Sequence, residues 1–183
     1  MRIAIDLDNT VFDTTRMIRD ICTRHGVDFN MMNIYDVYQC FPKNVADEIM
    51  HAFDSPELRK MPVLNKKIPQ TLNCIINRPD TDVYFITERP TETAAMDIEQ
   101  LKNAGIIFNP HNIVHCKPKI GALCNYGINL CFDDSPNIVC DCIKHSIDVV
   151  MISNKDTPYN HQLRERVEYY PDLMTALTKR GII

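Results

Sequence analysis

The chain has 183 residues, of which 45% are hydrophobic and 24% charged, a composition typical of a globular protein with one sizeable core. The formal net charge of −4 argues against a general nucleic-acid binder, whose surface is normally basic, but it permits a nucleotide-sized substrate. No apolar run approaches the roughly 20 residues of a membrane span. The acidic Asp6 follows the start too soon for a signal peptide, so we expect a cytoplasmic protein without a membrane or stable nucleic-acid partner.

The first half of the chain begins with a short apolar run at residues 2–7, which has the length and composition of a buried strand. The apolar residues of 13–25 recur on one stripe and predict an amphipathic helix. The alternation of strands and helices is then lost over residues 27–80. That stretch predicts helices at 44–53 and 67–77 and contains no good strand.

The second half of the chain alternates regularly between apolar runs and helical patterns. The predicted strands cover residues 83–86, 113–115, 128–132 and 147–153. The predicted helices cover residues 92–104, 118–125, 136–144 and 171–179. Such alternation implies βαβ units with right-handed crossovers, and therefore an α/β fold built on a parallel sheet.

Polar side chains gather where the predicted strands end. These residues are Asp6, Asp8, Thr87, Asp133 and Asp134. Ligands of parallel sheets bind beyond the carboxyl ends of the strands, so we expect these side chains to lie together. Taken singly, each has an ordinary structural explanation, such as a turn acid or the cap of a following helix. Their repetition at separate strand ends favours a metal site.

This group of residues suits phosphoryl transfer. Asp6 is the predicted nucleophile, because a carboxylate can accept a phosphoryl group as an acyl phosphate. Mg²⁺ would cancel the charge between the anions, with Asp6 and Asp133 as natural ligands and Asp134 binding directly or through water. Asp8 is placed to protonate the leaving oxygen and then to activate water.

Two further residues are expected to stabilise the phosphoryl oxygens. Thr87 offers a hydroxyl donor at the end of its strand, and Lys119 offers a compact positive charge at a predicted helix start. Lys117, on the other side of Pro118, is the reserve choice for this lysine. Substrate contacts are also expected from Glu88 and Arg89, although a salt bridge between Arg89 and a local acid is equally open.

Four motifs resemble those of the haloacid dehalogenase-like hydrolase superfamily. They are Asp6-Leu7-Asp8-Asn9-Thr10-Val11, Phe85-Ile86-Thr87, Lys119 and Phe132-Asp133-Asp134-Ser135, in the order of that superfamily. The resemblance implies a Rossmann-like three-layer core, Mg²⁺ held by Asp6, Asp8, Asp133 and Asp134, and an aspartyl-phosphate on Asp6. Within the superfamily, dehalogenases lack an acid two residues after the nucleophile and P-type ATPases carry Thr, so Asp8 indicates a phosphatase or phosphomutase.

The resemblance also predicts the domain organisation. An insert between the first two motifs is where the superfamily places a small helical C1 cap, so we expect a core of residues 1–14 and 81–183 with a cap of residues 15–80. Short chains with such a cap resemble the 5'(3')-deoxyribonucleotidase-like group. Phe12 and Phe41 are the aromatic residues that we expect to face the substrate.

The favoured function is therefore a Mg²⁺-dependent phosphomonoesterase acting on a small phosphate ester, a (deoxy)nucleoside monophosphate being one such ester. A phosphotransferase or phosphomutase that uses the same residues is the first alternative, and a non-catalytic ligand-binding relative is the second. The sequence does not specify the base, the sugar, the position of the phosphate or the oligomeric state.

Overall fold

The computed structural model describes residues 1–183, apart from the side chain of Met31. Its centre is a six-stranded sheet with the strand order β3-β2-β1-β4-β5-β6, in which every neighbouring pair is parallel. The strands are β1 (Arg2–Ile5), β2 (Asp82–Thr87), β3 (Ile113–His115), β4 (Leu130–Asp133), β5 (Asp148–Ile152) and β6 (Tyr169–Tyr170). The predicted α/β fold with a parallel sheet is confirmed, and only the two-residue edge strand β6 was not predicted.

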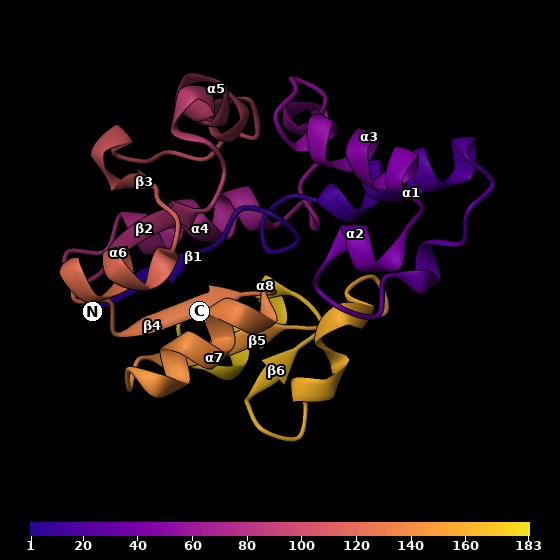
Figure 1. Ribbon diagram of the computed structural model, residues 1–183. Helices are drawn as coiled ribbons and strands as arrows, with labels where there is room; N and C mark the ends of the chain where they lie inside the picture. Colours follow the sequence, from indigo (N-terminus) through magenta and orange to yellow (C-terminus); the bar gives the residue numbers. More distant parts are fainter.

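The helices follow the predicted rhythm closely (Figure 1). They are α1 (Thr14–Arg24), α2 (Val37–Cys40), α3 (Lys43–Phe53), α4 (Ile68–Ile76), α5 (Ala94–Asn103), α6 (Lys119–Asn125), α7 (Pro136–Lys144) and α8 (Leu173–Lys179). The sequence did not predict α2, which has a single turn and starts at a side-chain cap from Asp36. Among the described residues, no helix has the length and apolar character needed to cross a lipid bilayer.

Alternate residues of each strand point into two separate hydrophobic clusters, so helices cover both faces of the sheet. Ile3 and Ile5 of β1 lie in one cluster with apolar residues of α4, α5 and α8. Ala4 lies in the other cluster, with residues of α6 and α7. This is the three-layer arrangement that a doubly covered parallel sheet requires.

A third hydrophobic cluster joins the helical segment that follows β1. It contains apolar residues of α1 and α3, such as Ile18 and Ile49, together with Phe41 and Tyr159. Figure 1 shows α1, α2 and α3 beside the sheet rather than over one of its faces. Helix α4 is different, because Ile68 and Leu72 pack with the sheet. The predicted limits of the cap, residues 15–80, stay a prediction.

Candidate functional site

Three buried carboxylates meet at the carboxyl end of the sheet. Asp6 directly follows β1, Asp133 ends β4, and Asp134 is the next residue. The register pairs Ile5 with Phe132, so the two strands end at the same level. One carboxylate oxygen from each residue lies within 4.8 Å of the others. The parallel sheet thus brings together the three acids that the sequence predicted to meet.

Lys119, the first residue of α6, lies inside this cluster. Its Nζ donates to Asp6 Oδ1 at 2.5 Å and to Asp133 Oδ2 at 2.8 Å, and its side chain is only 4% exposed. Lys117 lines the neighbouring cavity instead and has no ion pair among the described residues. Of the two lysines that the sequence left open, Lys119 is therefore the one in contact with the carboxylates.

The cluster carries more negative than positive charge, and its pKa values reflect this. Burial, reinforced by Asp133 and Asp134 and opposed by Lys119, raises the pKa of Asp6 well above its usual range. Burial and the charge of Asp133 raise the pKa of Asp134 to about 7. Burial acts to lower the pKa of Lys119, but the charges of Asp133 and Asp6 outweigh it and the pKa is raised.

A divalent cation would relieve this imbalance. Asp6 Oδ2 is buried and has no hydrogen-bond partner among the described residues, although a buried carboxylate oxygen normally has one. Three clustered carboxylates and an orphaned oxygen form the hard, anionic ligand set that suits Mg²⁺. The residues present therefore fit the predicted ion, with Asp6, Asp133 and Asp134 as its side-chain ligands.

The turn after β1 is held by Asn9, which has the left-handed backbone conformation (φ 52°) that asparagine tolerates better than most residues. Its Oδ1 accepts from Thr14 and Thr15 at the start of α1, and its Nδ2 donates to Asp134 Oδ2 and to the Tyr159 hydroxyl. Tyr159 in turn donates to Asp134. The sequence did not assign a role to Asn9 or Tyr159, yet both fix the orientation of the Asp134 carboxylate.

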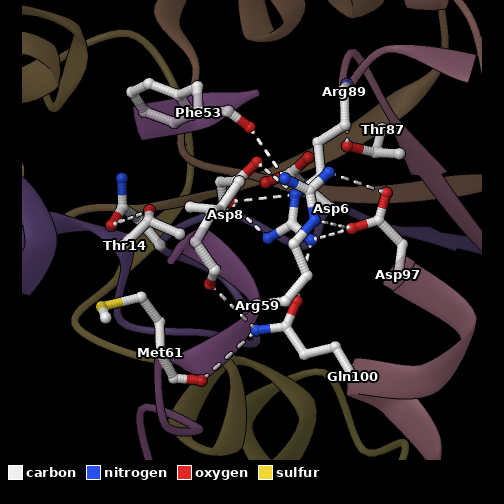
Figure 2. Close-up of polar contacts among 12 residues, drawn as sticks. Asp6, Asp8, Thr14, Phe53, Arg59, Met61, Thr87, Arg89, Asp97 and Gln100 are labelled. Carbon is white, nitrogen blue, oxygen red and sulfur yellow. Dashed lines mark hydrogen bonds and ion pairs between the residues drawn. The ribbon is translucent and has the colours of Figure 1, made fainter. Parts of the chain in front are cut away.

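Asp8 is not one of the three clustered carboxylates, and its side chain binds Arg89 (Figure 2). Arg89 Nη2 donates to Asp8 Oδ1 at 2.6 Å and Arg89 Nε donates to Oδ2 at 3.0 Å, which makes a bidentate fork. The guanidinium engages both carboxylate oxygens of Asp8, and the role of Asp8 as a metal ligand stays a prediction. For Arg89, the alternative of a salt bridge with an acid is the one observed, and the acid is not Glu88.

Thr87 is the last residue of β2, and Glu88 directly follows the strand. Thr87 is fully buried, and its Oγ1 accepts a 3.2 Å hydrogen bond from the Arg89 backbone N–H. Glu88 lines the cavity, whereas Thr87 does not. The hydroxyl that the sequence assigned to phosphate binding therefore holds the loop that carries Arg89 in this structure.

Arg89 belongs to a buried polar network centred on Asp97 of α5 (Figure 2). Asp97 accepts from Arg89 Nη1 at 2.5 Å, Arg59 Nε at 3.0 Å, Thr93 Oγ1 at 3.1 Å and His115 Nε2 at 3.0 Å. Burial acts to raise the pKa of Asp97, but His115 and the two guanidinium groups outweigh it and lower that pKa to about 2. No sequence pattern indicated this network.

A cavity of about 670 Å³ extends from the carboxylates to the helical segment. Its lining includes Asp6, Asp8 and Lys119, and the helical segment supplies apolar surface from Tyr35, Tyr38, Phe53, Met32 and Met50. Phe12 and Phe41, which the sequence placed at the substrate, do not line this cavity. They are 1% and 5% exposed because they fill the sheet core and the core of the helical segment.

No protein-family model matches the sequence, and no curated protein matches it significantly. The structure, in contrast, is similar to several solved structures. A haloacid dehalogenase-like family protein from Streptococcus pneumoniae is 16% identical with a TM-score of 0.61, over 98% of this chain and 97% of that chain. A protein proposed to be a phosphoglycolate phosphatase, from Lactobacillus plantarum, is 9% identical with a TM-score of 0.59, over 97% of each chain.

A third similar structure is a protein proposed to be a β-phosphoglucomutase, from Thermotoga maritima. It is 13% identical with a TM-score of 0.56, over 100% of this chain and 99% of that chain. Identities this low show a common fold and carry no assignment of substrate. The parallel sheet, its strand-end carboxylates and these neighbours agree on one architecture: the chain has the Rossmann-like fold of the haloacid dehalogenase-like hydrolases.

Proposed function

We propose that this protein is a Mg²⁺-dependent phosphomonoesterase that works through an aspartyl-phosphate on Asp6. The observation that carries the proposal is the buried cluster of Asp6, Asp133, Asp134 and Lys119 in the lining of a large cavity. The names of two structural neighbours, a phosphatase and a phosphomutase, support phosphoryl transfer as the chemistry of this fold.

The first step forms a bond between phosphorus and a carboxylate oxygen of Asp6 and breaks the bond between phosphorus and the ester oxygen. The leaving oxygen takes its proton from Asp8, which lines the same cavity. Lys119, already within hydrogen-bond distance of Asp6, offers positive charge to the phosphoryl oxygens. These roles follow the residue types and their placement.

The second step hydrolyses the acyl phosphate. Asp8 accepts a proton from the attacking water, the phosphorus–oxygen bond to Asp6 breaks, and phosphate leaves. In this structure Asp8 accepts two hydrogen bonds from Arg89, which hold its carboxylate in place. Mg²⁺, held by Asp6, Asp133 and Asp134, would supply the charge neutralisation that lets anionic groups approach one another.

The aromatic lining of the cavity suggests the substrate class. Tyr35, Tyr38 and Phe53 line the same cavity as the carboxylates and offer aromatic surface to the non-phosphate part of an ester. A flat, weakly polar group such as a nucleobase suits this surface, so a (deoxy)nucleoside monophosphate is our proposed substrate. We further propose that a helical cap covers the site and ends before α4, because α4 packs on the sheet.

The test is a screen of phosphate esters with and without Mg²⁺, covering nucleoside monophosphates, sugar phosphates and phosphorylated cofactors. The proposal expects Mg²⁺-dependent release of phosphate, fastest with nucleoside monophosphates, and none from an Asp6→Asn variant with an unchanged circular dichroism spectrum. Transfer to an acceptor that exceeds hydrolysis would instead identify a phosphotransferase. Absence of activity on every ester would favour a non-catalytic binding protein.

A further inference from the structure

We propose that Asp97 is a positioning residue for proton transfer by Asp8, acting through Arg89, and that Arg59 ties the helical segment to the same carboxylate. This inference rests on the proposed function, because it assumes that Asp8 gives a proton to the leaving group. Asp97 does not line the cavity, so it does not touch the substrate and is not itself catalytic.

The first step of the argument is how Arg89 is held. Its Nε and Nη2 are both directed at Asp8, while its Nη1 donates to Asp97 Oδ1 at 2.5 Å and to Gln100 Oε1 at 2.8 Å. The side chain is 2% exposed, so water does not substitute for these partners. Without Asp97, Nη1 would donate only to the neutral amide oxygen of Gln100. No anion on that side would then fix the orientation of the guanidinium plane.

The second step is the placement of Asp97 itself. Asp97, Gln100 and Leu101 are buried on one face of α5, and Leu101 packs in the sheet core. Because this packing fixes the helix to the sheet, the position of Asp97 is also fixed. Among the described residues only Arg89 donates to the Asp8 carboxylate, so the fork links the orientation of that carboxylate to α5.

The third step concerns the helical segment. Arg59 donates to Asp97 and, through Nη1, to the backbone carbonyls of Phe53 and Ser55, both at 2.9 Å. Gln100 Nε2 reaches the nearby carbonyls of Leu58 and Met61 at 3.3 Å. Phe53 lines the cavity and lies near Asp8 (Figure 2), so Asp97 is linked to that wall through Arg59 and to the proton donor through Arg89.

Paired charges explain why a carboxylate is needed at this point. Two guanidinium groups, each nearly inaccessible to water, share Asp97, and Asp8 supplies the second negative charge of the group. His115 and Thr93 complete the hydrogen bonds of Asp97 Oδ2. An amide at this position would preserve the shape of the side chain but would leave the charge of two buried arginines balanced by Asp8 alone.

The experiment compares two esters with different needs for a general acid. p-Nitrophenyl phosphate releases a stable phenolate and needs little protonation, whereas β-glycerol phosphate releases an alkoxide and needs a proton. For Asp97→Asn we expect kcat/KM, which reports the first step alone, to fall about tenfold more on β-glycerol phosphate than on p-nitrophenyl phosphate. The same split, larger in size, is expected for Asp8→Asn.

The controls separate positioning from general damage. Asp148→Asn, which removes an exposed partner of Arg180, should leave both esters unaffected. The double variant Arg89→Gln/Asp97→Asn should be no slower than Arg89→Gln alone, because Asp97 is expected to act only through Arg89. If Asp97→Asn does not fold, the variant Asp97→Asn/Arg59→Gln, which removes one charge of each sign, takes its place. The same difference in activity loss between the two esters is expected for it.

The outcomes distinguish this inference from the proposed function. An equal loss on both esters in Asp97→Asn, while Asp8→Asn shows the split, would overturn the positioning role and leave the phosphomonoesterase intact. Additive losses in the double variant would also overturn it. Absence of a split in Asp8→Asn, or inactivity of the wild-type protein on both esters, would overturn the proposed mechanism and this inference together.

Discussion

Replacing Asp134 with asparagine should stabilise the protein when Mg²⁺ is removed. Asp134 is 3% exposed and shares its site with Asp6 and Asp133, with one ammonium group to balance them. Its pKa is raised to about 7 from an ordinary value of 3.8. Ionising this carboxylate in the folded, metal-free protein therefore costs free energy that the unfolded chain does not have to supply.

The size and sign of the effect follow from that difference. A raised pKa in the folded state favours folding below about pH 4 and progressively opposes it as the pH rises to about 7. The difference of about 3 pH units corresponds to about 4 kcal/mol at 1.4 kcal/mol per unit. Asparagine keeps an oxygen that can accept from Tyr159, so the variant should retain most of this gain at pH 8.

The assay is urea unfolding in a chelator at about pH 5 and pH 8, followed by circular dichroism. We expect Asp134→Asn to exceed the wild-type free energy of unfolding by several kcal/mol at the higher pH and by much less at the lower pH. Added Mg²⁺ should raise the stability of the wild type far more than that of the variant. A variant that is less stable than the wild type at pH 8 without Mg²⁺ would refute the reasoning.

Four other predictions concern single side chains. Asp6→Asn should reduce phosphate release to background while the circular dichroism spectrum stays unchanged, as measured by a phosphate assay and by far-UV circular dichroism. The wild type should lose about 2 kcal/mol of its free energy of unfolding between about pH 4 and pH 2, because the pKa of Asp97 is lowered to about 2. Asp97→Asn should lack this contribution, and the free energy of unfolding measured along an acid titration would show whether the loss disappears. Phe53→Ala should raise KM for a nucleoside monophosphate several-fold with kcat nearly unchanged, and an equal effect on a small alkyl phosphate would contradict this. Tyr159→Phe should weaken Mg²⁺ binding about tenfold by calorimetry, because Asp134 loses a donor, and unaltered affinity would count against it.

The parts of the site that were predictable are those that the sheet itself brings together. Asp6, Asp133 and Asp134 end neighbouring parallel strands, and the rule that strand ends share one edge is sufficient to join them. Lys119 begins the helix before β4, so its distance from Asp133 is limited by local geometry. Apolar periodicity located most helices and strands for the same reason: each buries one defined face.

The parts that were not predictable depend on which surfaces meet. Asp97 is one of several polar residues in α5, and its partners Arg59 and His115 lie 38 and 18 residues away without any shared pattern. The helix predicted at 67–77 corresponds to α4, which packs on the sheet. An apolar stripe alone cannot distinguish packing on the sheet from packing within a cap. Phe12 and Phe41 were misplaced because an aromatic side chain fits a core as well as a substrate wall.

The most direct test of the central claim is to locate the phosphoryl group on the protein during turnover. An acid quench within the first turnover, followed by borohydride reduction, converts an aspartyl-phosphate to homoserine, which peptide mass spectrometry can place in the sequence. We predict homoserine at position 6 in the wild-type protein with Mg²⁺ and substrate, and none when either is omitted. Homoserine at another aspartate, or rapid phosphate release without any modified aspartate, would contradict the account.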